Sequence, residues 1–135
     1  MSTTSTLKAV YQQWCDAVAA ARGNSNSVLA LYAPDAIIAA TFNKTLLKDL
    51  EQKQRYFKVF TSLTNLKVAT KAYYEHVFDD FATTIGIYSF VYEKEDKIEE
   101  VDVRFSFSYA KKDGTWLIIN HHSSALPTVS LAEQA

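Results

Sequence analysis

Two stretches of alternating or continuous apolar residues near the C-terminus predict a β-hairpin. Val101 to Tyr109 place apolar side chains at every second position, and a second apolar run extends from Trp116 to Ser123. Between them, Lys112-Asp113-Gly114 supplies the glycine that a tight turn with positive φ requires. We expect a three-residue loop with Gly114 in the left-handed conformation, which pairs Lys111 with Thr115.

This register separates the hairpin into two faces. Phe107 then lies opposite Ile119, and Phe105 lies opposite His121. The resulting apolar face is interrupted only by His121 and Ser123 at the end far from the turn. The other face carries the residues that we expect at a subunit interface or in an anion-binding site: Arg104, Trp116, Asn120 and His122.

The first half of the chain has helical periodicity. Apolar residues spaced by three and four predict amphipathic helices over Thr3–Ala21 and from about Lys48 to Phe60. A short helix between them must stop before Pro34, because proline disfavours helix in the preceding residue. Ala36–Phe42 then fits a short strand. The N-terminal half is therefore mainly helical.

The second half is predicted to be nearly all sheet. Leu66–Val77 and Phe81–Tyr92 form long strands that precede the hairpin. The fold class is therefore α+β, with three N-terminal helices packed on one face of a strongly curved antiparallel sheet. These strands carry apolar residues on both faces, whereas an exposed antiparallel sheet usually has a polar outer face. We expect the outer face to contact another subunit.

Length, charge and cysteine content narrow the class of protein. The 135 residues fit one domain over residues 1–135, with an ordered core from about 5 to 127. A net charge of −1 gives no general attraction to nucleic acid or to anionic membranes. The chain shows no signal-peptide pattern, and Cys15 is its one cysteine, so no internal disulfide forms and a cytoplasmic protein is expected.

The chemistry-bearing residues suggest neither a metal nor a cofactor. His121 and His122 are adjacent on a strand, so their side chains point to opposite faces and cannot share an ion without a bulge. Cys15 lies in a helix with no evident base, which favours a small apolar role. His121 is the best candidate for a general acid or base, although the more common role for such a residue is a histidine at the edge of the core that donates one ring proton to a neighbour.

Two further sets of residues have alternative interpretations. Arg104 could hold an anion, or could form an ion pair with Asp102 of a partner subunit or with Glu75 across the sheet. Aromatic residues at helical and strand spacing could belong to the core or could line a cavity inside the curved sheet. The expected lining of such a small-ligand pocket is Trp14, Phe42, Phe57, Phe107, His121 and Ser123.

The segment KKDGTWLIINHHSSALPTV resembles the C-terminal strand of the calcium/calmodulin-dependent protein kinase II association domain and of its stand-alone bacterial relatives. Leu31 to Ala36 is similar to the L-Y-A-x-D-A segment of these proteins, and Tyr56-Phe57 with Phe60 is similar to their Y-F-x-x-F helix. The resemblance implies a cone fold like that of nuclear transport factor, also called cystatin-like. It also implies self-association into dimers or larger rings.

The chain departs from the kinase domain at the pocket. Where the kinase hub carries pocket arginines, this chain aligns Phe107 and Ser123, so the acidic-ligand site of the hub is not transferred. No kinase catalytic elements are present in the sequence. Two hypotheses remain: a non-catalytic, self-associating domain with a small-ligand pocket in the cone, or a metal-independent isomerase, cyclase or hydratase that uses His121 as acid or base.

Overall fold

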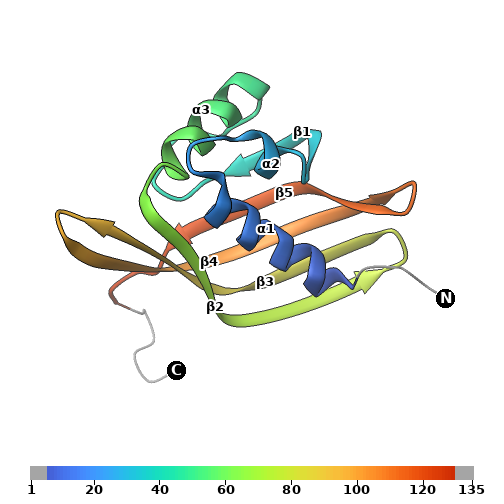
Figure 1. The fold of residues 1–135 in the computed structure, drawn as a ribbon. Helices are drawn as coiled ribbons and strands as arrows, with labels where there is room; N and C mark the ends of the chain where they lie inside the picture. The colour runs from blue at the N-terminus through green and yellow to red at the C-terminus, as the bar shows by residue number, and fades with distance from the viewer. Residues whose placement is uncertain (1–5, 130–135) are drawn as a thin grey trace.

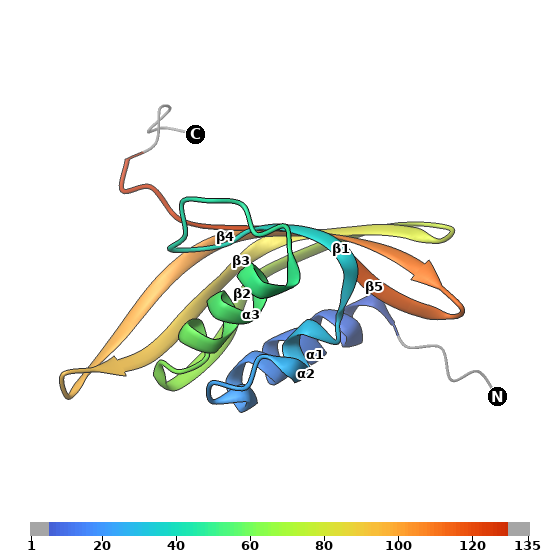
Figure 2. The same cartoon turned by 90° about the horizontal axis from the view of Figure 1, so that it is seen from above.

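Helix α1 (Leu7–Ala21) lies in the concave face of the sheet. The computed structural model describes residues 6–129, and Figure 2 shows the helices gathered beneath the curved sheet. The helix begins at Thr6, whose side chain accepts a hydrogen bond from the Ala9 N–H, and it ends where Arg22 adopts a left-handed conformation. Its buried face follows the predicted spacing of three and four.

The segments that follow α1 form the rim of the cone. Helix α2 (Asn26–Leu29) is a single turn, and strand β1 (Tyr32–Ala39) follows it. The strand begins earlier than predicted because it lies at the sheet edge, where a proline such as Pro34 is tolerated. Helix α3 (Leu50–Phe60) begins with a capping box in which Asp49 and Gln52 satisfy each other's backbone N–H groups.

Four long strands complete the sheet in the order β1-β5-β4-β3-β2. They are β2 (Thr64–Phe78), β3 (Phe81–Lys94), β4 (Lys97–Lys112) and β5 (Thr115–Ala125). Neighbouring pairs are antiparallel except that β1 runs parallel to β5. The predicted α+β class, with helices on one face of a curved sheet, is confirmed (Figure 1).

Aromatic rings join α1 to the sheet. Trp14 stacks on Tyr88 with ring centroids 5.5 Å apart, and Tyr11 stacks on Phe105 at 5.2 Å. Phe107, between them on the inner face, meets the edge of Trp14. All five rings are almost fully buried, so burial of aromatic surface stabilises the contact between helix and sheet.

The predicted hairpin exists, but its predicted register is wrong. Lys112 pairs with Thr115, so the loop holds two residues, Asp113 and Gly114, both with positive φ. The register also shifts between Ser108 and Tyr109, which leaves Ile119 as an extra residue on β5. Beyond this bulge, Phe107 lies opposite His121 and not opposite Ile119.

The hairpin turn depends on Gly114, whose φ is +80°. Valine at this position should lower the free energy of unfolding by about 1 kcal/mol or more, because β-branched residues are strained at positive φ. A Cβ at this site would meet nothing within 4 Å, so the backbone alone carries the cost. Urea unfolding of Gly114→Val tests this. Asp113→Gly is the matched control, whose free energy of unfolding should be unchanged or higher. A free energy of unfolding of Gly114→Val equal to that of the parent would contradict the turn geometry.

Candidate functional site

A small cavity lies inside the cone, between α1, α3 and the inner face of β3 and β5. Its volume is about 10 Å³, which leaves room for roughly one water molecule. Trp14, Phe57, Tyr88, His121 and Ser123 are among the side chains that line it. The interior is therefore packed nearly full.

His121 is held between two tyrosines. The Trp14 Nε1–H donates to Tyr32 Oη at 3.0 Å, and that oxygen lies 2.8 Å from His121 Nδ1. On the other side of the ring, His121 Nε2 lies 3.1 Å from Tyr88 Oη. All four side chains are buried, so these contacts form in a region of low effective dielectric.

The donors fix the tautomer of His121. Indole can only donate, so Tyr32 Oη accepts from Trp14 and its own proton is directed to Nδ1. Tyr88 donates its proton to Ser123 Oγ at 2.8 Å, so its oxygen accepts from Nε2–H. The geometry thus assigns a neutral imidazole that accepts at Nδ1 and donates at Nε2.

The network continues to the rim of the cone. Ser123 Oγ lies 2.5 Å from Thr41 Oγ1, and the Tyr56 hydroxyl donates to the Thr41 carbonyl at 2.7 Å. Within residues 6–129, no buried side-chain nitrogen or oxygen lacks a hydrogen-bond partner. A fully satisfied network of this kind stabilises one arrangement of the core.

Burial keeps the network neutral. It lowers the pKa of His121 to about 3, with a smaller contribution from neighbouring His122. Burial also raises the pKa of Tyr32 and of Tyr88 well above the usual range, so both hydroxyls stay protonated. With both ring nitrogens engaged, His121 offers no free lone pair for proton transfer near neutral pH.

The expected pocket residues occupy three different environments. Trp14, Phe57, His121 and Ser123 line the cavity, whereas Phe107 stacks flat on the His121 ring with centroids 3.9 Å apart. Phe42 lies outside the cone interior and is 60% exposed. The six residues therefore do not line one ligand pocket.

Three important polar partners were missed from the sequence. Tyr32 lies on the edge strand, Tyr88 on the inner face of β3, and Thr41 in the loop after β1. The alternation of β3 could have assigned Tyr88 to the inner face. Nothing local in the sequence brings Tyr32 to a histidine 89 positions away.

The residues expected at an interface divide between the two faces of the sheet. Arg104, Asn120 and His122 are exposed on the outer face, opposite the helices. Trp116 was placed with them, and this is wrong. The bulge at Ile119 reverses the alternation, so Trp116 lies on the inner face, where its ring is buried and contacts the Lys111 side chain.

Asp102 is already engaged within the protomer. Its carboxylate accepts from the Ser89 hydroxyl and lies 3.8 Å from Lys71 Nζ, which also binds Glu100 at 2.7 Å. No ion pair is found for Arg104 within the described part of the chain. These contacts involve one oxygen of the Asp102 carboxylate, so the expected pairing of Arg104 with Asp102 of a partner stays a prediction.

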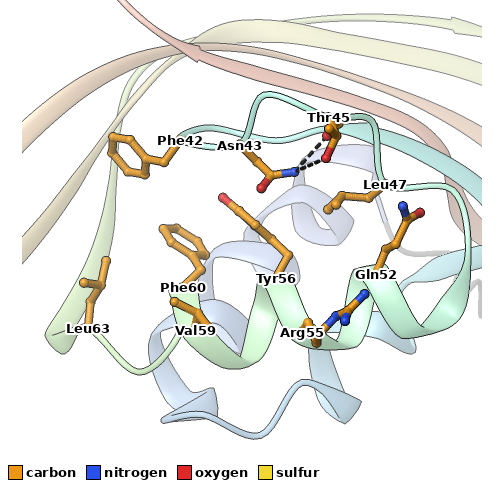
Figure 3. A pocket seen from close by; sticks show the side chains of 10 residues that line it. All are labelled: Phe42, Asn43, Thr45, Leu47, Gln52, Arg55, Tyr56, Val59, Phe60 and Leu63. Carbon is orange, nitrogen blue, oxygen red and sulfur yellow. Dashed lines mark hydrogen bonds between the residues drawn. The ribbon is translucent and has the colours of Figure 1, made fainter.

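A larger groove opens at the rim, between α3 and the loop that follows β1 (Figure 3). Its volume is about 440 Å³. Phe42, Phe60 and Leu63 lie toward one end, and Gln52 and Arg55 lie toward the other. This rim groove shares Tyr56 and Phe60 with the cone cavity but opens to the outside.

The described residues include neither a reactive cysteine nor a cluster of metal-binding side chains. Cys15 is buried, and burial raises the pKa of its thiol to about 11, so a thiolate is scarce at neutral pH. No group of three or more His, Cys, Asp or Glu residues within 6–129 is placed to hold a metal ion. Over the same residues, no helix is long and apolar enough to cross a membrane.

The depressed pKa of His121 predicts a pH-dependent stability. The unfolded chain binds a proton near pH 6.5 and the folded chain only near pH 3, so stability falls as the pH drops through this window. Between pH 7 and pH 5 the loss from this group should be about 2 kcal/mol. Chemical unfolding at both pH values measures it.

Two variants serve as references for this pH effect. The loss should persist in His122→Gln, which removes the exposed neighbour, and should largely disappear in His121→Gln. Equal pH dependence in the parent and in His121→Gln would mean that His121 titrates normally in the folded protein.

Comparison with known proteins agrees with this architecture. A protein from Xanthomonas campestris named for the calcium/calmodulin dependent protein kinase II association domain is 37% identical, with a TM-score of 0.83 over 91% of this chain and 87% of the other. A nuclear-transport-factor-like protein with a cystatin-like fold from Novosphingobium aromaticivorans is 10% identical, with a TM-score of 0.77 over 95% and 84%. The kinase hub of S. rosetta is 15% identical, with a TM-score of 0.75 over 93% and 98%.

No curated protein sequence matches the chain. The likeness to the Novosphingobium aromaticivorans structure shows the cystatin-like fold that the family resemblance implied. The family model of the calcium/calmodulin dependent protein kinase II association domain matches residues 4–127. Since this match covers nearly the whole chain, the protein belongs to the calcium/calmodulin dependent protein kinase II association domain family.

Proposed function

We propose that the protein is a non-catalytic association domain that binds further copies of itself through the outer face of its sheet. The observation that carries this proposal is the exposure of large apolar side chains on that face. Tyr74 is 66% exposed and Ile85 is 55% exposed, and the two lie opposite each other on β2 and β3. Contiguous apolar groups on an exposed sheet are typical of interaction sites.

The outer face also carries a hollow that a partner could fill. Its volume is about 560 Å³, and its lining includes the polar residues Arg104, His122 and Ser124. Tyr74 and Ile85 also line it. A central apolar area beside a few polar groups resembles the anatomy of subunit interfaces.

Family membership supports self-association as the role of this face. The family is named for association, and the S. rosetta relative is a hub. We infer a homodimer or a larger assembly of identical subunits. An Arg104 buried in such an interface needs acceptors, which the second carboxylate oxygen of a partner's Asp102 or the partner's hydroxyls and carbonyls could supply.

The alternative of His121 catalysis fits less well. A general base must reach its substrate, but both His121 nitrogens bind tyrosines and the adjacent cavity holds about 10 Å³. The same cavity volume argues against a small ligand inside the cone. Our proposal therefore includes neither a reaction nor an interior ligand.

Charge reversal at Arg104 tests the proposed interface. Arg104→Glu should weaken association by roughly 2 to 5 kcal/mol, the range for buried interfacial charges, while circular dichroism keeps the parent's spectrum. Arg55→Glu is the matched control, because it makes the same charge change on the helical side. Light scattering after size exclusion measures the masses.

Two outcomes would contradict the proposal. A parent protein that stays monomeric at micromolar concentration would exclude self-association. An Arg104→Glu protein with the parent's mass would exclude this part of the outer face as the interface.

A further inference from the structure

The rim groove contains a strained and exposed aromatic residue. Phe42 has a φ of +68°, a left-handed conformation that is unfavourable for a bulky side chain. Its ring is nevertheless 60% exposed, so core packing does not explain the strain. Residues held in such conformations cluster at functional sites.

The neighbours of Phe42 hold its backbone in place. The Thr41 carbonyl accepts from the Tyr56 hydroxyl, and the Thr41 side chain bonds to Ser123. On the other side, the Asn43 N–H donates to the Ala40 carbonyl at 3.3 Å. These contacts fix the turn on both sides of Phe42, and Figure 3 shows its ring above the groove.

Apolar surface continues past the groove itself. Val59 on the groove wall is 72% exposed, and Leu46 and Leu50, which are near lining residues in the sequence, are more than half exposed. A small molecule that filled the groove would leave these last two uncovered. A protein segment that runs across the groove would cover all of them.

The charge around the groove is positive. Residues 41–60 contain five basic and two acidic residues in a chain whose net charge is −1. One of the five, Lys53, is buried and donates to the Pro34 carbonyl, so the exposed residues of this segment carry four basic and two acidic groups. Arg55 lies 3.5 Å from Glu51, but both are highly exposed, so this pair is weak and can be exchanged. Gln52 uses its carbonyl oxygen in the helix cap, which leaves its NH₂ as a donor.

We propose that the rim groove binds an acidic segment of a partner protein that inserts one large apolar side chain. That side chain packs between Phe42 and the Val59–Leu63 side of the groove, and its flanking carboxylates lie toward Arg55 and Gln52. The groove lies on the α3 side of the molecule and uses no residue of the outer sheet face, so the inference does not depend on self-association.

An unbiased peptide selection tests the inference. A random heptapeptide display library is selected on the whole protein, and the enriched peptides are synthesised with a fluorophore and titrated by anisotropy. The selected sequences should share one Phe, Trp or Leu flanked by Asp or Glu. Their binding should weaken as salt is raised, since exposed charges are screened.

Variants locate the bound peptide. Phe42→Gly removes the ring and relieves the backbone, so it should weaken binding at least about tenfold, as expected of a central contact, with an unchanged or higher melting temperature. Arg55→Gln should weaken binding by about threefold to tenfold and reduce its salt dependence. Ile98→Ala, which removes a 75% exposed residue at the β3–β4 hairpin, should leave binding unchanged.

Several results would overturn the inference. They are the absence of enriched acidic–apolar sequences, equal binding to the parent and to Phe42→Gly, and a large fall in the melting temperature of Phe42→Gly. Light scattering on the same samples separates this inference from the proposed self-association, because a monomeric parent that still binds the peptide contradicts only the latter.

Discussion

A neutral histidine held between two buried tyrosines is the interaction on which the interior of this protein depends. His121 on β5 accepts from Tyr32 on β1 and donates to Tyr88 on β3, while Trp14 on α1 donates to Tyr32. Four elements thus meet through hydrogen bonds whose directions follow from the Trp14 indole, which can only donate, and from Tyr88, which donates to Ser123. Removing any one hydroxyl would leave a buried polar group unpaired, which costs about 1 to 3 kcal/mol.

The same interaction explains why the interior of the cone has almost no empty volume. Phe107 and Ser123 fill the space around this histidine, because Phe107 stacks on the His121 ring while Ser123 accepts from Tyr88. Both of our proposals therefore concern surface features: the outer sheet face around Tyr74 and the rim groove at Phe42.

The fold could be predicted from local patterns, whereas the site could be predicted only in part. Helical spacing in α1 and alternation in β4 are strong signals, and His121 was assigned correctly to the apolar face. The bulge at Ile119 has no local signature, because one extra residue in a strand looks like ordinary sequence. That single residue decides the faces of Trp116 and Ile118, and the contact between Tyr32 and His121 depends on tertiary packing alone.

The central claim, that His121 is a neutral and fully bonded structural group, is tested most directly by nitrogen NMR of its imidazole. The account predicts the neutral tautomer protonated at Nε2 throughout the range from pH 8 to about pH 4, in agreement with a pKa lowered to about 3. A His121 ring that titrates near its ordinary pKa of about 6.5, or one protonated at Nδ1, would contradict it.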